Sequence, residues 1–235
     1  MNKFEIGQNK DISLGKKISL LYNNSDLTRA LVMLLPAGGI VDMFACKSAH
    51  QFTQEKVNVL INELAGRLDN IEHVLMSHED ESMFFHLVYK ACQNVVTTRS
   101  QEKISRFACV LSNSIEFRTD WDETETLLNL VESLTDTHIK ILSSICKLDP
   151  NMHKEFENMR VVKLVDISTP GEIPHLQECI QGSNEETLKI YCSDLIAKGL
   201  LSDEGIGRWD GKPLQLVRVN DSSAWFLNQI REKFA

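Results

Sequence analysis

The residues best able to do chemistry are two histidines beside a run of carboxylates. His73 and His78 lie close to Asp80 and Glu81, and the segment HEDES begins at His78. Imidazole nitrogens and carboxylate oxygens are common zinc ligands, so these residues are a candidate metal or enzyme site. The five-residue spacing of the histidines does not place both on one helical face. A solvated loop between two helices is therefore the favoured interpretation.

No other segment indicates catalysis. The chain has no P-loop, no glycine fingerprint for nucleotides, no GxSxG, no HExxH and no zinc-ligand spacing. No two cysteines form a CxxC, which favours buried free thiols in a reducing cytosol over a disulfide or zinc framework. The cysteines are Cys46, Cys92, Cys109, Cys146, Cys179 and Cys192. We therefore predict that the protein is not an enzyme and holds no metal or cofactor.

The composition narrows the class of partner. The formal net charge of −8 argues against general nucleic-acid binding, which needs Lys and Arg against phosphates, and against adsorption to anionic lipid. The N-terminus lacks the apolar segment of a signal peptide. The most apolar run, residues 30–41, is much shorter than the ~20 residues that span a bilayer. These features predict a cytoplasmic protein without a membrane span, whose partners are proteins.

Apolar spacing predicts helices through the first half of the chain. Polar residues that can cap a helix precede several of them, such as Asp80 and Ser100. The expected helices cover residues 26–35, 40–47, 48–75, 81–98, 101–115 and 121–134.

The helix over 48–75 carries an a/d heptad pattern. Its apolar residues are spaced four and three apart over almost three heptads, as in a coiled coil. They are Val57, Ile61, Leu64, Leu68, Ile71 and Leu75. One interpretation makes this stripe a dimer seam or a partner-binding surface. The other, which we favour because Gly66 interrupts the run, makes it the core face of a helix in the chain's own bundle.

The segment from Leu134 onward resembles a winged helix-turn-helix. It begins with a helix over 136–148 whose expected apolar stripe is Ile139, Leu142, Ile145 and Cys146. A strand within 160–167, helices over 170–180 and 184–198, a wing around 210–211, a returning strand over 214–219 and a final helix from 220 follow. Gly182 and Gly199 stand where glycines usually close helices.

The charges of this module favour a protein partner over DNA. In a winged helix, the second helix of the pair would enter the major groove, but here that helix begins with acidic residues. The wing carries three cations, which are few for binding the phosphates of a DNA backbone. The candidate contact face comprises Glu185, Glu186, Lys189, Arg208, Lys212 and Arg218.

Residues 30–148 resemble a group of bacterial helical proteins related to the abortive-infection alpha type. The resemblance lies in the order of four segments: LLPAGGIVD, QEKVNVLINELAGRLDNI, SQEKISRFACVLSNSI and ETETLLNLVESLTDTHIKILSSI. Members of this group share a layout in which the dipeptide EK, a helix, LL, L followed by S or T, H followed by I or L, and IL occur in this order. The resemblance implies a bacterial cytosolic protein associated with phage defence, and it carries no catalytic positions.

Together these patterns predict a mostly α protein. Residues 1–120 form a multi-helix bundle, and residues 121–235 form a winged-helix-like domain with a small β wing and a terminal helix. The predicted function is non-catalytic interaction with a protein partner or a second copy of the chain, in phage defence or a stress response. The alternative is a dimeric winged-helix regulator of transcription, which the acidic charge disfavours.

Overall fold

The protein is mostly helical, with one small antiparallel sheet, as its sequence predicts. The structure is a computed structural model that describes residues 47–68, 78–168, 172–180, 182–206 and 211–231. The helices expected over 26–35 and 40–47 lie outside these residues. The chain divides into two compact units, which we call unit 1 (residues 1–128) and unit 2 (residues 129–235).

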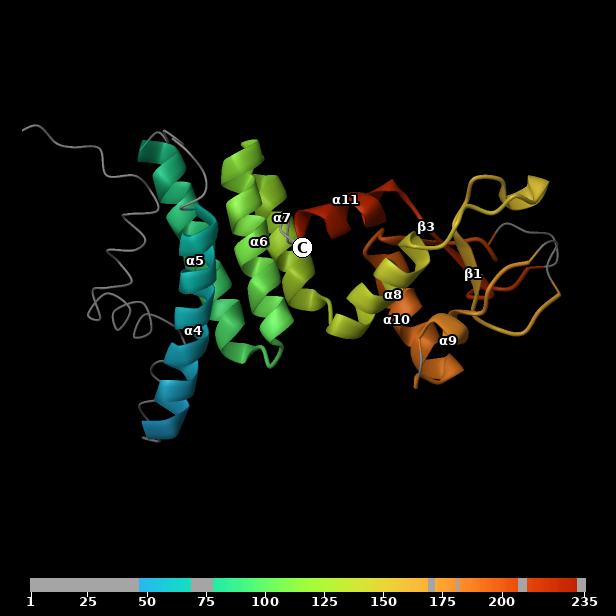
Figure 1. Cartoon of the computed structure of the whole chain (residues 1–235), viewed down its shortest axis with the longest axis horizontal. Coiled ribbons are helices and arrows are strands. Elements are labelled where there is room, and N and C mark those ends of the chain that lie inside the picture. The colour runs from blue at the N-terminus through green and yellow to red at the C-terminus, as the bar shows by residue number, and fades with distance from the viewer. Residues whose placement is uncertain (1–46, 69–77, 169–171, 181, 207–210, 232–235) are drawn as a thin grey trace, which may run out of the picture. The chain divides into compact units, whose positions relative to one another are not determined.

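Unit 1 is built from long helices that lie alongside one another (Figure 1). They are α4 (Lys47–Leu68), α5 (His78–Thr97), α6 (Gln101–Phe117) and the beginning of α7 (Trp121–Ser133). Helix α4 packs against both α5 and α6. The predicted extension of α4 to residue 75 lies outside the described residues.

Helix α6 is the centre of unit 1. Every residue from Phe107 to Ile115 is buried, so this stretch has no solvent-facing side. The buried hydroxyls of Ser112 and Ser114 donate to carbonyls of their own helix, so their burial leaves no donor unused. Ser100 caps the helix as predicted, because its side chain accepts a hydrogen bond from the backbone N–H of Lys103 at 3.0 Å.

The first turns of α7 belong to unit 1, so the units divide at 128 rather than at the predicted residue 120. The Trp121 indole donates to an Asp80 carboxylate oxygen at 3.2 Å, and Lys90 donates to Glu125 at 2.6 Å. Both bonds tie α7 to α5. Asp80 therefore lies inside the first turn of α5, which begins at His78, and not at the cap position before it, and it accepts a bond from α7.

Unit 2 interleaves short helices with three strands. In chain order they are α8 (Asp136–Cys146), a 3-10 turn η1 (Lys154–Phe156), β1 (Val161–Lys163), α9 (Leu176–Cys179), α10 (Glu185–Ala197), β2 (Leu201–Asp203), β3 (Leu216–Val219) and α11 (Asp221–Gln229). The strands pair antiparallel in the order β1-β3-β2. Helix α8 packs against α9, α10, α11 and β3, which makes it the core helix of this unit.

Two of the three helices predicted after residue 170 match the structure closely. Asn184 caps α10 and Asn220 caps α11, each through a side-chain oxygen that accepts a backbone N–H. Gly182 and Gly199 have φ of 82° and 71°, the left-handed conformation that glycine adopts without strain. The helix expected over 170–180 is shorter, because the Lys163 N–H donates to the Pro174 carbonyl and holds the preceding chain beside β1.

One carboxylate holds the base of the β2–β3 connection. Asp203 accepts the backbone N–H of Gly205 through one oxygen and that of Leu214 through the other, each at 2.8 Å. A side chain at Gly205 would place its Cβ 2.1 Å from the Lys212 carbonyl oxygen, so only glycine fits there. The end of β2 and the approach to β3 are therefore held together independently of the strand pairing.

Lys56 joins α4 to the end of α5. Its ammonium donates to the carbonyls of Val96, at 3.1 Å, and of Thr98. A positive charge at a helix C-terminus is favourable because the last carbonyls point outward without helical partners. Burial, and then the charge of Arg99, lower the pKa of Lys56.

Replacing this lysine should loosen one helix junction and leave unit 2 unchanged. Lys56→Met removes both bonds and leaves two carbonyls without their donor, which we expect to cost about 1–3 kcal/mol. Hydrogen exchange should quicken in α4 and at the end of α5. Arg99→Met, which removes an exposed cation nearby, is the control. Equal exchange in the two variants would show that the Lys56 bonds do not support the junction.

Candidate functional site

A buried histidine joins the first helix of unit 2 to α10. His138 is 5% exposed, and its Nδ1 accepts the backbone N–H of Thr135 at 3.0 Å. Its Nε2 lies 3.2 Å from a carboxylate oxygen of Asp194 on α10. The Tyr191 ring stands edge-on to the imidazole, with 4.7 Å between ring centroids. Because Nδ1 accepts, we assign the ring proton to Nε2, facing the carboxylate.

The apolar spacing of the sequence does not reveal this role of His138. That spacing predicts Ile139, Leu142, Ile145 and Cys146 as the apolar stripe of α8, whereas the buried residues are His138, Ile141, Leu142 and Ile145. Ile139 and Cys146 are only half-buried, because α10 covers the face that carries His138. A signal was present in the sequence. His138 stands three residues after the capping residue Thr135, where a side chain can return to the cap.

Lys189 in α10 and Lys198, which follows the helix, are both paired with acids of α10. Lys189 lies 2.7 Å from Glu185 and 3.1 Å from Glu186, and Lys198 lies 2.6 Å from Asp194. The hydrogen bond to Glu185, followed by that to Glu186, raises the pKa of Lys189. Three acids against two lysines leave α10 without an excess of positive charge.

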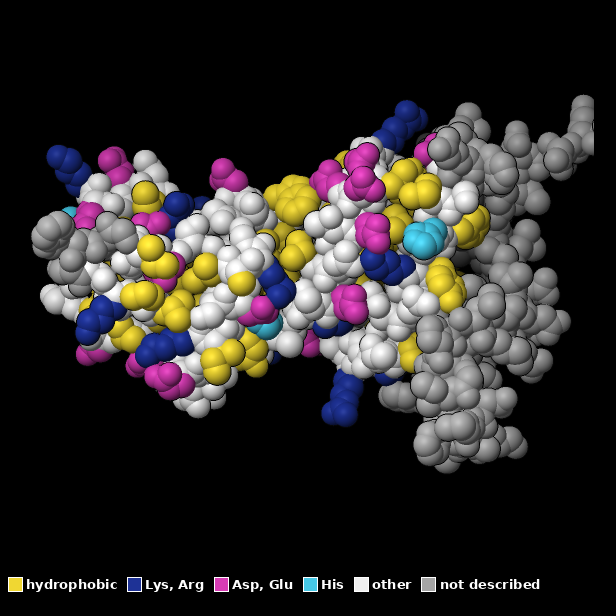
Figure 2. Space-filling model, turned by 180° about the vertical axis from the view of Figure 1, so that it is seen from behind, with side chains coloured by type: hydrophobic (Ala, Val, Ile, Leu, Met, Phe, Trp, Pro, Cys, Tyr) yellow, Lys and Arg dark blue, Asp and Glu magenta, His cyan; other side chains and the backbone are white. Residues whose placement is uncertain are grey.

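The wing residues of the predicted contact face do not form a basic patch either. Arg218 pairs with Glu204 across the β2–β3 connection. Lys212 is exposed, and Arg208 lies outside the described residues. On the face seen in Figure 2, Lys and Arg are interspersed with Asp and Glu.

The outward side of α10 is apolar and acidic. Four residues spaced four, three and four apart are exposed there: Glu186, Ile190, Ser193 and Ala197. Ile190 is 69% exposed, and the side chain of Glu186 is 80% exposed. We call these four residues the α10 face. Ile190 is thus the one large apolar side chain among the four exposed residues of this face.

The predicted seam on α4 is largely covered by the chain itself. Val57, Leu64 and Leu68 are buried, together with Leu60, and Ile61 is half-buried. Since α4 packs against α5 and α6, the first part of the heptad stripe serves as the core face of this bundle. Ile71 and Leu75 lie outside the described residues.

The described residues contain no cluster of His, Cys, Asp and Glu that could hold a metal ion. His73 lies outside the described residues, and so does the side chain of His78. Among the described helices, none is both long and apolar enough to cross a bilayer. Comparison with protein-family models, curated proteins and solved structures found no match. The resemblance to the abortive-infection alpha type stays a prediction.

The histidine contact can be tested by its effect on unit 2. His138→Ala should lower the stability of this unit by about 1–3 kcal/mol, because a buried ring is lost between α8 and α10 and the Thr135 N–H loses its acceptor, while Asp194 keeps Lys198. Pulse proteolysis in urea should therefore cut the residues of unit 2 at lower denaturant concentration. His153→Ala, which changes an exposed histidine beside η1, should have a smaller effect. Similar losses in both variants would contradict a structural role for the buried ring.

Proposed function

We propose that unit 2 is a winged helix-turn-helix that binds a protein partner through the α10 face. The element order supports the first part of this proposal: α8, β1, α9, α10, β2 and β3 follow one another as the helices and strands of a winged helix do. The strand order β1-β3-β2 agrees with it, and so does the turn at Gly182 between the two short helices.

The proposal of a protein partner rests on the charges and exposed side chains of α10. In the DNA-binding modules, the second helix presents side chains that donate to bases and phosphates. Here Lys189 in that helix and Lys198 just after it are both paired with acids, and the most exposed large apolar side chain of the helix is Ile190. An apolar centre within a polar surround is the composition of a protein interface.

The partner's chemistry follows from the α10 face. It has an apolar pocket or groove for Ile190 and room for the small side chains of Ser193 and Ala197. A cation beside that pocket would meet Glu186, which is exposed although it also accepts from Lys189. The resemblance in the first part of the chain suggests phage defence or a stress response as the setting.

DNA binding is the second candidate, and the element order alone favours it. A dimeric regulator would be retarded with duplex DNA from its own promoter region, and its affinity would fall steeply with salt as counterions are released. Light scattering at low salt, with and without that duplex, separates the two functions. If the duplex does not change the mass of the protein, the protein-binding proposal stands. If a salt-dependent complex forms, DNA binding replaces that proposal.

The α10 face can be tested by crosslinking and by charge insertion. A photo-crosslinking amino acid at position 190 should yield a stoichiometric adduct with one protein in the cells that make this chain. Ile190→Asp should weaken the same complex by about tenfold or more, as truncation of a central contact residue typically does.

Met152 provides the matched control. It is also exposed and apolar, at 91%, but it lies before η1 and away from α10. Met152→Asp should leave the complex intact, and a crosslinker at 152 should give no adduct. An adduct that forms equally from both positions, or none from position 190, contradicts the proposal.

A further inference from the structure

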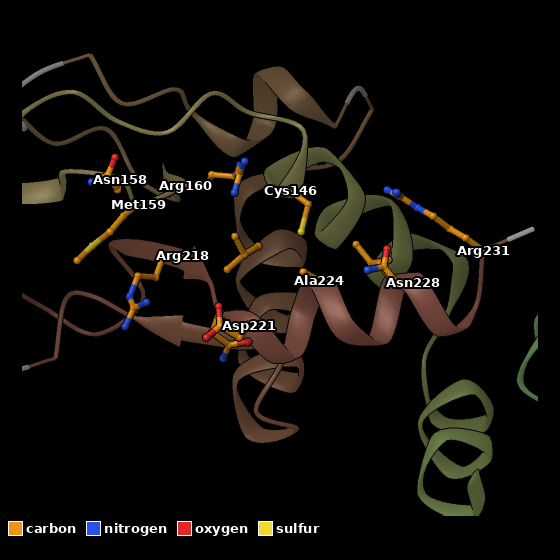
Figure 3. Close-up of a pocket in the computed structure, with 12 residues that line it drawn as sticks. Cys146, Asn158, Met159, Arg160, Arg218, Asp221, Ala224, Asn228 and Arg231 are labelled. Atoms are coloured by element: carbon orange, nitrogen blue, oxygen red, sulfur yellow. The ribbon is translucent and has the colours of Figure 1, made fainter. Parts of the chain in front are cut away.

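A second surface of unit 2 has different chemistry from the α10 face. An open groove of about 610 Å³ lies between the end of α8, the approach to β1, the end of β3 and α11 (Figure 3). No residue of α10 lines it. Its volume lies within the range of small-molecule sites, about 300–1,000 Å³.

The lining of the groove is rich in arginine. Arg160, Arg218 and Arg231 line it, while Asp221 is the only carboxylate among the described residues of the lining. They come from three segments, namely the approach to β1, β3 and the end of α11. The protein as a whole carries a net charge of −8, so this lining has the opposite sign to the chain average.

Two of the arginines are held in place through one nitrogen each. Arg160 donates from Nε to the Leu148 carbonyl at 2.8 Å, and Arg218 donates from Nε to Glu204. A guanidinium has further N–H donors on its Nη groups, which these contacts leave for a ligand. The third, Arg231, is exposed just beyond α11.

Cys146 lies in the part of the groove that Arg160 and Arg231 also line. Figure 3 shows its sulfur between the side chains of Arg160 and Arg231. Burial raises the pKa of this thiol, and the charges of Arg160 and Arg231 oppose the rise. Arg160 and Arg231 therefore both lie near enough to Cys146 to act on its thiol electrostatically.

We infer that this groove binds a small phosphorylated ligand of about nucleotide size. Guanidinium groups match phosphate oxygens with paired N–H donors, so a phosphate would bind at the end of the groove that Arg160 and Arg231 line. Asn228 stands beside Arg231 at that end, and Asp221 stands at the other end of α11; both can bind hydroxyl or amino groups. Met159 and Val219 add apolar surface for the remainder of the ligand.

Calorimetric titration of the full chain tests the inference. The probes are AMP and ATP, with inorganic phosphate, citrate and adenosine for comparison. We expect AMP or ATP to bind, adenosine not to bind, and citrate to bind more weakly. Arg231→Gln should weaken binding by about tenfold or more, because it removes one charge-assisted contact. Arg160→Lys keeps the charge but loses the paired donors, so it should also weaken binding.

The control variant is Lys140→Gln. It removes an exposed cation from α8 without touching the groove, so binding should stay unchanged. If inorganic phosphate alone binds as tightly as AMP, or citrate does, the ligand class is wrong. If no phosphorylated probe binds, or binding is the same in Arg231→Gln as in the unchanged protein, the groove is not the site. The α10 face is unaffected by these outcomes.

Cys146 gives an independent readout. In a background of Cys46→Ser and Cys179→Ser, the other thiols are buried, and burial raises the pKa of Cys92 and Cys192 to about 12. Only thiolate is alkylated, so the raised pKa of Cys146 should make its reaction slow at pH 8 and faster as the pH rises.

Arg231→Gln should slow this alkylation further, since it removes a charge that lowers the pKa of Cys146. A bound phosphate should slow it too, by neutralising the arginines and covering the sulfur. Alkylation at one rate with and without AMP, at a concentration that saturates the titration, would place the ligand elsewhere.

Discussion

The packing of unit 2 depends on the burial of one polar ring between two helices. His138 is 5% exposed; its Nδ1 accepts the Thr135 N–H, and its Nε2 faces the Asp194 carboxylate at an ion-pair distance of 3.2 Å. A buried imidazole with no polar groups beside its nitrogens would cost more free energy. The contact thus selects the orientation of α10 relative to α8, with Tyr191 packed against the ring edge. That orientation decides which side of α10 faces outward.

The outward side of α10 owes its charge pattern to ion pairs within the helix and with Lys198, the residue that follows it. Glu185 and Glu186 hold Lys189, and Asp194 holds Lys198 while also meeting His138. Asp194 therefore has a structural and an electrostatic role at once. Ion pairs at such surfaces add little stability, but they direct two cations away from any phosphate. Ile190 is left as the exposed apolar centre, which is why the proposed partner is a protein.

Unit 2 carries two surfaces of different chemistry on one small framework. The α10 face is apolar and acidic, while the groove between α8, β3 and α11 is lined by arginines. Helix α8 supports both, since it packs against α10 and against α11, and Cys146 at its end lines the groove. A ligand in the groove would therefore contact the same core helix that positions the α10 face.

Much of the local structure was determined by the sequence alone. The caps at Ser100, Asn184 and Asn220 act between residues three apart, and Gly182 and Gly199 close turns by their own backbone freedom. Apolar spacing likewise predicted the helices and the returning strand, because periodicity reports local geometry directly. The burial of the heptad on α4 also agrees with the favoured interpretation, as far as the stripe is described.

Only the tertiary structure decided which distant groups meet. The contact of His138 with Asp194 joins residues far apart in the chain, and so do the bonds from Lys90 to Glu125 and from Lys56 to α5. The arginine groove gathers three segments that no spacing rule connects. Spacing describes one helix or strand at a time, whereas packing several elements around α6 or α8 selects the pairs of side chains that lie within bonding distance.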